Sequence, residues 1–275
     1  MTSPLWRRLA AEFVGTALLV TAVVGSGVMA SRLSPSDVGL QLLENSVATA
    51  LALTVLILML APISGAHFNP VVSAADWWLG RRGTDRLSAA ELGSYTLAQV
   101  VGAIAGAVLA DAMFGVPLGM STKHRSDSHL WLGEVVATAG LLLLIFALVR
   151  TGRAALAAPA VGAYIGAAYW FTSSTSFANP AVTVGRAFTD TFAGIAPASV
   201  PGFVGAELVG LAVGIAFIVA LYPARLRTSE AVALSDVDAV GANVETSKSD
   251  RASQRGNRPR SLAAAPPVTT NGADQ

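Results

Sequence analysis

The sequence contains no cysteine, few charged residues and few histidines. Without cysteine there is no disulfide framework, no thiolate metal ligand and no thiol nucleophile. Only 13% of its 275 residues are Asp, Glu, Lys or Arg, compared with roughly 25% in a soluble domain. The three histidines, His67, His124 and His129, do not have the spacing of a metal site. The sequence therefore predicts no bound metal.

A strong excess of basic residues is also missing. The formal net charge is +1, whereas binding to nucleic acid needs a basic surface that neutralises phosphates. We therefore expect no nucleic-acid partner. The apolar segments also lack a paired nucleophile and base, or a cluster of metal ligands, so we do not expect an enzyme.

Apolar residues make up 53% of the chain and are concentrated in long runs. A helix that crosses a bilayer needs about 20 mostly apolar residues. We interpret the first run as a retained helix, because no cleavage site stands out and other spans follow it. The sequence predicts an all-α protein embedded in the lipid bilayer, with six transmembrane helices at about 9–30, 46–63, 92–114, 130–149, 154–171 and 201–222.

Two shorter segments, 69–79 and 179–192, each begin with an Asn-Pro pair. The first pair is Asn69-Pro70, within ISGAHFNPVVS, and the second is Asn179-Pro180, within SFANPAVT. Asparagine is a favoured helix N-cap, and proline fits the first helical position because it needs no amide donor there. Both segments are too short to cross a bilayer. We therefore predict two re-entrant half-helices, surrounded by protein or by a water-filled cavity.

The two halves of the chain, about 9–114 and 130–222, repeat one pattern. Glu12 and Glu134 hold matching positions in the first and fourth spans, and Gln99 matches Glu207 in the third and sixth. Each half has two spans, a half-helix and a third span. An odd number of spans reverses the second half in the membrane, so the sequence predicts an inverted 3+3 repeat with its site at the midplane.

Glycines recur four residues apart in the third and sixth spans. This spacing lets helices approach closely in lipid, so we predict a packing role for them. The glycines are Gly102, Gly106, Gly210 and Gly214.

Charge and composition predict the orientation and the domains. Lys and Arg in the connections are concentrated on one side of the predicted bundle, which the positive-inside rule assigns to the cytoplasm of the cell together with both termini. The smaller set on the other side is Arg32, Lys123, Arg125 and Arg186. Residues 1–223 are predicted to form the membrane domain. Residues 224–275 are polar, with few aromatic residues, and predict a disordered cytoplasmic tail.

Together these motifs resemble the aquaporin family, the major intrinsic proteins. The resemblance covers about 9–222 and rests on SGAHFNP, SFANPAVT, the AEFVGT opening, and the AQxxG and AExxG helices. It implies a passive channel for water or small neutral solutes, without a cofactor, and a homotetramer in which each subunit has its own pore. It also implies a pore midplane where two asparagines offer amide donors, formed by Asn69, Pro70, Val71, Asn179, Pro180 and Ala181.

Two residues depart from the family pattern. Val71 replaces the alanine of the first Asn-Pro-Ala motif, which affects the packing of the half-helices. Val182 lies three residues after Asn179, where water-selective and glycerol-selective members have an arginine of the selectivity filter. The charged member of the filter is therefore missing.

Distance from the two asparagines predicts the other filter positions as Thr49, Ala167 and Ser176. With Val182 they form a ring without an aromatic or charged residue, wider than a water or glycerol filter. This ring resembles the bacterial branch of the family linked to arsenic. Glycerol-like solutes and arsenous or methylated arsenic acids are therefore expected substrates.

Two questions stay open at this stage. Arg186 lies one turn beyond Val182 and either lines the outer vestibule or extends its charged end to the membrane interface. The buried carboxyl groups either accept hydrogen bonds from the backbone before each half-helix or carry protons for a coupled transporter. The alternative function is thus a proton-coupled secondary transporter of a small solute. The residues predicted to be buried and structural are Glu12, Glu134, Gln99, Glu207 and His67.

Overall fold

The structure is a computed structural model that describes residues 3–80 and 87–223. All regular elements in these residues are helices, and six of them are long and apolar enough to cross a membrane. The six predicted spans are therefore confirmed. They are α1 (Leu5–Leu33), α2 (Val38–Ser64), α4 (Ala89–Phe114), α5 (Ser128–Arg150), the 3-10 turn η2 (Ala154–Leu156) with α6 (Ala157–Phe171), and η4 (Pro197–Ser199) with α8 (Val200–Leu221).

Helix α2 begins eight residues before the predicted start at residue 46 because polar side chains bond within the bundle. Asp37 caps the helix by accepting a hydrogen bond from the Leu40 amide at 2.9 Å. Gln41 donates to the Ser34 carbonyl at 2.7 Å, and Asn45 donates to the Val23 carbonyl at 2.9 Å. Because these hydrogen bonds satisfy the side-chain amides of Gln41 and Asn45, burying them costs little free energy.

The two predicted half-helices are α3 (Pro70–Leu79) and α7 (Pro180–Gly185). The second was predicted to continue to residue 192, which is wrong. The chain tightens into the 3-10 turn η3 (Arg186–Phe188) and then becomes extended at Thr189. The Thr189 hydroxyl donates to Asp111 Oδ1 at 2.7 Å, and this buried bond draws the chain out of the helix.

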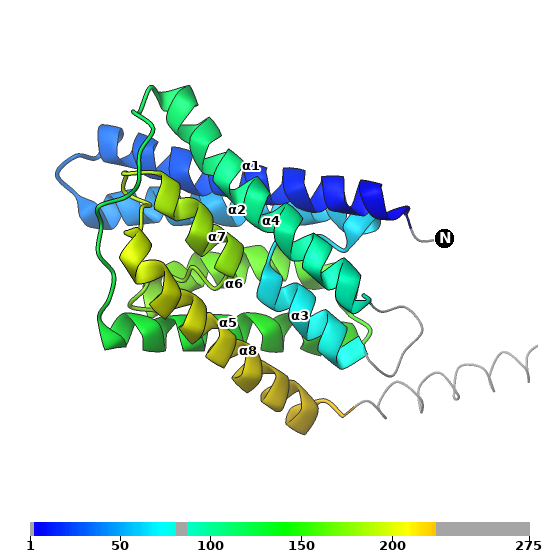
Figure 1. Cartoon of the computed structure of the whole chain (residues 1–275). Coiled ribbons are helices and arrows are strands. Elements are labelled where there is room, and N and C mark those ends of the chain that lie inside the picture. Colours follow the sequence, from blue (N-terminus) through cyan, green and yellow to red (C-terminus); the bar gives the residue numbers. More distant parts are fainter. Residues whose placement is uncertain (1–2, 81–86, 224–275) are drawn as a thin grey trace, which may run out of the picture. The chain divides into compact units, whose positions relative to one another are not determined.

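The short helices lie among the long ones. Figure 1 shows α3 and α7 beginning near the middle of the bundle and running toward its opposite ends. In the first half α1 packs on α4, and in the second half α5 packs on α8. This matches the inverted repeat that the sequence predicts.

The repeated glycines lie at these two helix contacts. A Cβ atom at Gly102 would be 2.5 Å from the Phe13 carbonyl oxygen, and one at Gly106 would overlap the Ala17 carbonyl oxygen. In the second half, a Cβ atom at Gly210 would be 2.7 Å from Thr138 Cβ. The predicted packing role of these glycines is therefore confirmed.

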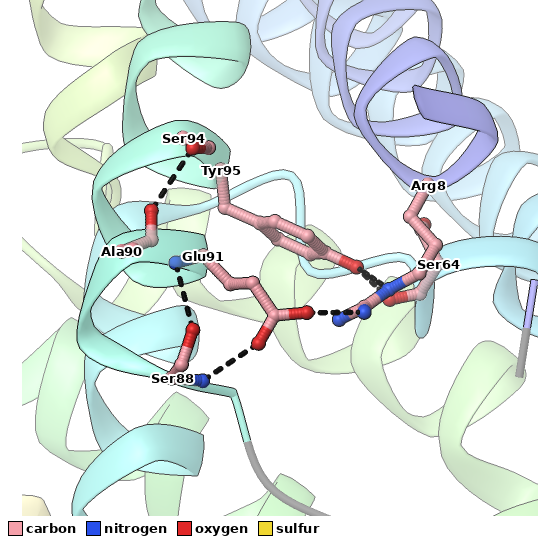
Figure 2. Close-up of polar contacts among 7 residues, drawn as sticks. All are labelled: Arg8, Ser64, Ser88, Ala90, Glu91, Ser94 and Tyr95. Atoms are coloured by element: carbon pink, nitrogen blue, oxygen red, sulfur yellow. Dashed lines mark hydrogen bonds and ion pairs between the residues drawn. The ribbon is translucent and has the colours of Figure 1, made fainter. Parts of the chain in front are cut away.

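A polar cluster joins α1, α2 and α4 at one end of the bundle (Figure 2). Arg8 donates to the Tyr95 hydroxyl at 2.8 Å and forms an ion pair with Glu91 at 2.7 Å. Tyr95 in turn donates to the Ser64 carbonyl at 2.9 Å, at the end of α2. Ser88 and Glu91 form a capping box at the start of α4, which holds Glu91 in place.

The predicted cytoplasmic tail, residues 224–275, lies outside the described residues, as does the connection at 81–86.

Candidate functional site

A cavity of about 520 Å³ lies between the two halves. Its lining follows α6 from Ala158 to Tyr169, which is about three helical turns. Asp76 and Val149 line one end, and Arg186 lines the other. Asn69 and Asn179 both line the cavity between these ends, so the two half-helices begin at its wall.

The two asparagines are bound to each other's half-helix. Asn69 Nδ2 donates to the Ala178 carbonyl at 2.7 Å, and Asn179 Nδ2 donates to the Phe68 carbonyl at 2.8 Å. Each side-chain oxygen caps its own helix, accepting from the amide of Val71 in one case and from Ala181 and Val182 in the other. An amide NH2 has two donors, so one donor on each asparagine remains for the cavity.

The backbone before each asparagine has the same unusual conformation. The residues one and three positions earlier have positive φ, between 49° and 52°, in both halves: Ala66 and Phe68, and Ser176 and Ala178. This region is unfavourable for residues with a side chain and persists only where surrounding contacts impose it.

Two buried carboxylates supply these contacts. Glu12 accepts from the His67 amide at 3.0 Å and from the Phe68 amide at 2.6 Å. Glu134 accepts from Phe177 at 2.9 Å and from Ala178 at 2.6 Å. The amides therefore point away from the pore, and the carbonyl oxygens of Phe68 and Ala178 receive the asparagine bonds. This arrangement is what the structural interpretation of the carboxyl groups requires.

Gln99 and Glu207 hold matching places behind the two half-helices. Gln99 Nε2 donates to Glu12 at 2.8 Å and to Ser73 at 3.0 Å. Glu207 accepts from the Asn179 amide at 3.0 Å and from the Thr183 hydroxyl at 2.7 Å.

His67 was expected to be buried, but it is half-buried and lines the cavity. Its amide is held by Glu12, and its Nδ1 lies 3.0 Å from the Ser73 hydroxyl. The first contact holds the backbone of His67 and the second orients its ring at the cavity wall.

Three of the four predicted filter residues line the cavity: Thr49, Ser176 and Val182. The fourth, Ala167, does not. It is exposed on the outer face of α6, and Tyr169 lines the cavity instead, with its hydroxyl 3.2 Å from Thr49 Oγ1. The ring therefore contains an aromatic residue, which corrects the prediction.

The spacing of residues along one face of α6 indicates that Tyr169, and not Ala167, lines the cavity. Counting back from Asn179 assumes a connection of fixed length and does not take account of which face of α6 points at the cavity. After Ala157 at its start, the residues of α6 that line the cavity are Ala158, Val161, Ile165 and Tyr169. They recur every three or four residues, as one helix face does.

Arg186 is only 4% exposed and lines the cavity, so it does not extend to the membrane interface. Its guanidinium carbon lies 3.4 Å from the centre of the Phe177 ring, and its Nε donates to the Ala193 carbonyl. Arg125 approaches the same ring at 5.3 Å, and its Nε donates to the Gly194 carbonyl at 3.1 Å. Burial lowers the pKa of Arg125 below its usual value.

Comparison with known proteins agrees with this geometry. The sequence pattern described as Major intrinsic protein matches residues 1–178, more than half of the chain. The chain belongs to the major intrinsic protein family. Members of this family, the aquaporins, are passive membrane channels for water and small uncharged solutes. The cavity between the halves is thus the pore of a multi-pass channel.

Relatives of the channel cover most of its length. It is 51% identical over 223 residues to "Aquaglyceroporin AqpS" of Rhizobium meliloti, covering 80% of this chain and 93% of that protein. It is 35% identical over 206 residues to "Aquaporin Z" of Brucella melitensis, covering 68% of this chain and 86% of that one. The solved aquaglyceroporin of Plasmodium falciparum has the same fold, with a TM-score of 0.60, 21% identity and coverage of 78% and 96%.

Proposed function

We propose that this channel conducts uncharged solutes larger than water, including glycerol-like polyols and arsenous or methylated arsenic acids. The observation that carries this proposal is the place of Val182. Its short apolar side chain lines the pore three residues after Asn179, where a filter arginine would fill space and carry charge. The 51% identity to a protein named an aquaglyceroporin supports the same class of solute.

The hydroxyl groups of the proposed filter suit polyols and oxyacids. Ser176 Oγ is buried at the pore wall without a hydrogen-bond partner among the described residues. Thr49 and Tyr169 contribute two further hydroxyls to the same lining, and these lie 3.2 Å apart. A solute with several hydroxyl groups can replace its bonds to water with bonds to these three oxygens, which lowers the cost of entering the filter.

At the midplane, Asn69 and Asn179 act as the central donors. Each keeps one amide hydrogen for the pore, because the other is bound to the opposite half-helix. An oxygen that accepts from both asparagines directs its own hydrogens away from the midplane. Protons therefore do not pass along the file, and the positive N-termini of the half-helices add to the barrier against cations.

We propose further that the channel lies in the cell membrane as a homotetramer with both termini in the cytoplasm, and that it has neither a catalytic role nor a cofactor. The orientation follows from the positive-inside rule. It places the Arg186 end of the pore outside the cell and the Asp76 end inside.

The experiment is a flux measurement on purified channel in liposomes, with a panel of water, glycerol, urea and arsenous acid. Glycerol and arsenous acid should enter well above the rate in protein-free liposomes, linearly with concentration and equally with or without a proton gradient. Water flux without glycerol flux would contradict the proposed solute class. Saturable flux that follows the proton gradient would instead indicate a coupled transporter.

A further inference from the structure

We propose that Arg186 supplies the positive charge of the filter from one helical turn beyond Val182, excluding cations and donating hydrogen bonds to solute oxygens at that end of the pore. This inference rests on the proposed filter. It divides that filter into an uncharged level, formed by Thr49, Tyr169, Ser176 and Val182, and a charged level formed by Arg186. The uncharged level can then be wide enough for larger solutes, while the charged level excludes cations.

The position of Arg186 is fixed by contacts that leave its charge directed at the pore. Its guanidinium stacks on Phe177, which itself packs edge-on against Phe203 with ring centres 5.0 Å apart. Its Nε donates to the Ala193 carbonyl. A guanidinium has five N–H donors, and in the described part of the chain its two terminal amino groups donate to no protein acceptor. These groups are available to molecules in the pore.

The charge of Arg186 is also not neutralised by an ion pair. Within residues 3–80 and 87–223 the one ion pair joins Arg8 and Glu91, in the polar cluster of α1 and α4. The nearest carboxyl groups, Glu134 and Glu207, already accept from backbone amides before and at Asn179. An unpaired positive charge beside a narrow aqueous path raises the energy of every cation that enters it.

Packing alone does not explain an arginine at this place. An unpaired buried charge costs free energy that an apolar side chain at the same place would not. The aromatic ring and one carbonyl offset part of that cost. Two neighbouring charges add to the field. Arg125 lies over the same Phe177 ring, 5.3 Å from its centre, and Lys123 donates to the Phe192 carbonyl at 2.9 Å.

Arg32 offers a matched control at a position that does not line the pore. It also stacks on an aromatic ring, that of Phe114 at 5.4 Å, and also donates to a carbonyl, that of Phe114 at 2.6 Å. Its removal takes away one charge and one stacked guanidinium without changing the pore lining.

The test measures potassium and glycerol permeability on the same liposomes for the unmodified channel, Arg186→Gln, Arg186→Lys and Arg32→Gln. Potassium permeability should rise about fivefold or more in Arg186→Gln, because a unit charge at contact distance changes the occupancy of a cation by about this factor even at the dielectric constant of water, and by more near a protein surface. It should stay at the background level in Arg186→Lys and Arg32→Gln. Glycerol permeability should remain in all four.

The potassium measurement decides this inference and the glycerol measurement decides the proposed function, so the two can fail separately. Arg186→Gln that conducts glycerol but not potassium would overturn the inference. So would a potassium leak of equal size in Arg186→Lys, since that variant keeps the charge. If Arg186→Gln gives no folded channel, Arg186→Met, which is also uncharged, takes its place: glycerol flux with a potassium leak supports the inference, and glycerol flux with potassium excluded rejects it.

Discussion

At the level of single residues, each asparagine has three separate partners. Its oxygen caps a half-helix, one amide hydrogen binds the opposite half-helix, and we propose that the second is offered to the pore. The cross-bonds explain why an asparagine is needed in both copies. Aspartate or serine would cap a helix equally well, but neither has an NH2 group to donate across the midplane.

Asn179→Asp tests this account of the midplane. The carboxylate would keep the cap but lose the donor, and it would place a negative oxygen opposite the Phe68 carbonyl, at the 2.8 Å contact that Nδ2 now makes. Glycerol and water permeability should fall by about tenfold, as expected when a bond of about 1.4 kcal/mol is lost from the path. Potassium leak should appear, because the carboxylate attracts cations.

The control for this variant is Asn45→Asp, which makes the same chemical change at a buried amide that does not line the pore. It should lower the stability of the protein without a potassium leak. Unchanged permeability in Asn179→Asp liposomes would show that Asn179 is not a pore donor.

At the level of elements, close contacts between α1 and α4 and between α5 and α8 stabilise the two halves. Gly106→Ala should destabilise the channel by about 1–3 kcal/mol, because the added methyl overlaps the Ala17 carbonyl and the helices must separate. Gly93→Ala, in the same helix, meets no atom within 4 Å. It should be neutral or stabilising by up to about 1 kcal/mol, since alanine favours a helix.

Thermal unfolding of the two glycine variants in detergent measures this difference. A lower midpoint for Gly106→Ala and an equal or higher one for Gly93→Ala are expected. Equal midpoints for both variants would mean that the contact between α1 and α4 tolerates a wider spacing than the structure implies.

The elements were largely predictable because their signals are local. Apolar length predicts the six spans, and Asn-Pro predicts both half-helix starts. The ends were harder, because distant contacts determine them. Gln41 and Asn45 extend α2 by bonding to α1 and its following turn, and Thr189 ends the second half-helix by bonding to Asp111 on α4. None of these partners can be read from the neighbouring sequence.

At the level of the whole molecule, the internal repeat explains which parts of the site were predictable. The carboxylates and asparagines occur twice, so each copy supports the interpretation of the other, and both sets lie at the predicted contacts. The filter residues do not follow the internal repeat, so no second copy supports their assignment. Ala167 was predicted from distance along the chain, whereas Tyr169 lines the pore because it lies on the same face of α6 as Ala158, Val161 and Ile165.

The sequence left two places open for Arg186, the outer vestibule and the membrane interface. The pattern expects an arginine at 182, and one at 186 has no counterpart in the first half. Only its burial and its place on the pore wall distinguish it from an interfacial arginine.

The most direct test of the central claim, a pore widened by Val182, is the ratio of glycerol to water permeability in the unmodified channel and in Val182→Arg. The arginine should narrow the ring formed with Thr49, Tyr169 and Ser176, because it is longer than valine and fills the pore with a planar guanidinium. Water is small and can accept from the new donors. We predict a ratio that falls by about tenfold, equivalent to about 1.4 kcal/mol, with water permeability largely kept. An unchanged ratio at equal protein content would contradict the account, since Val182 would then lie outside the constriction.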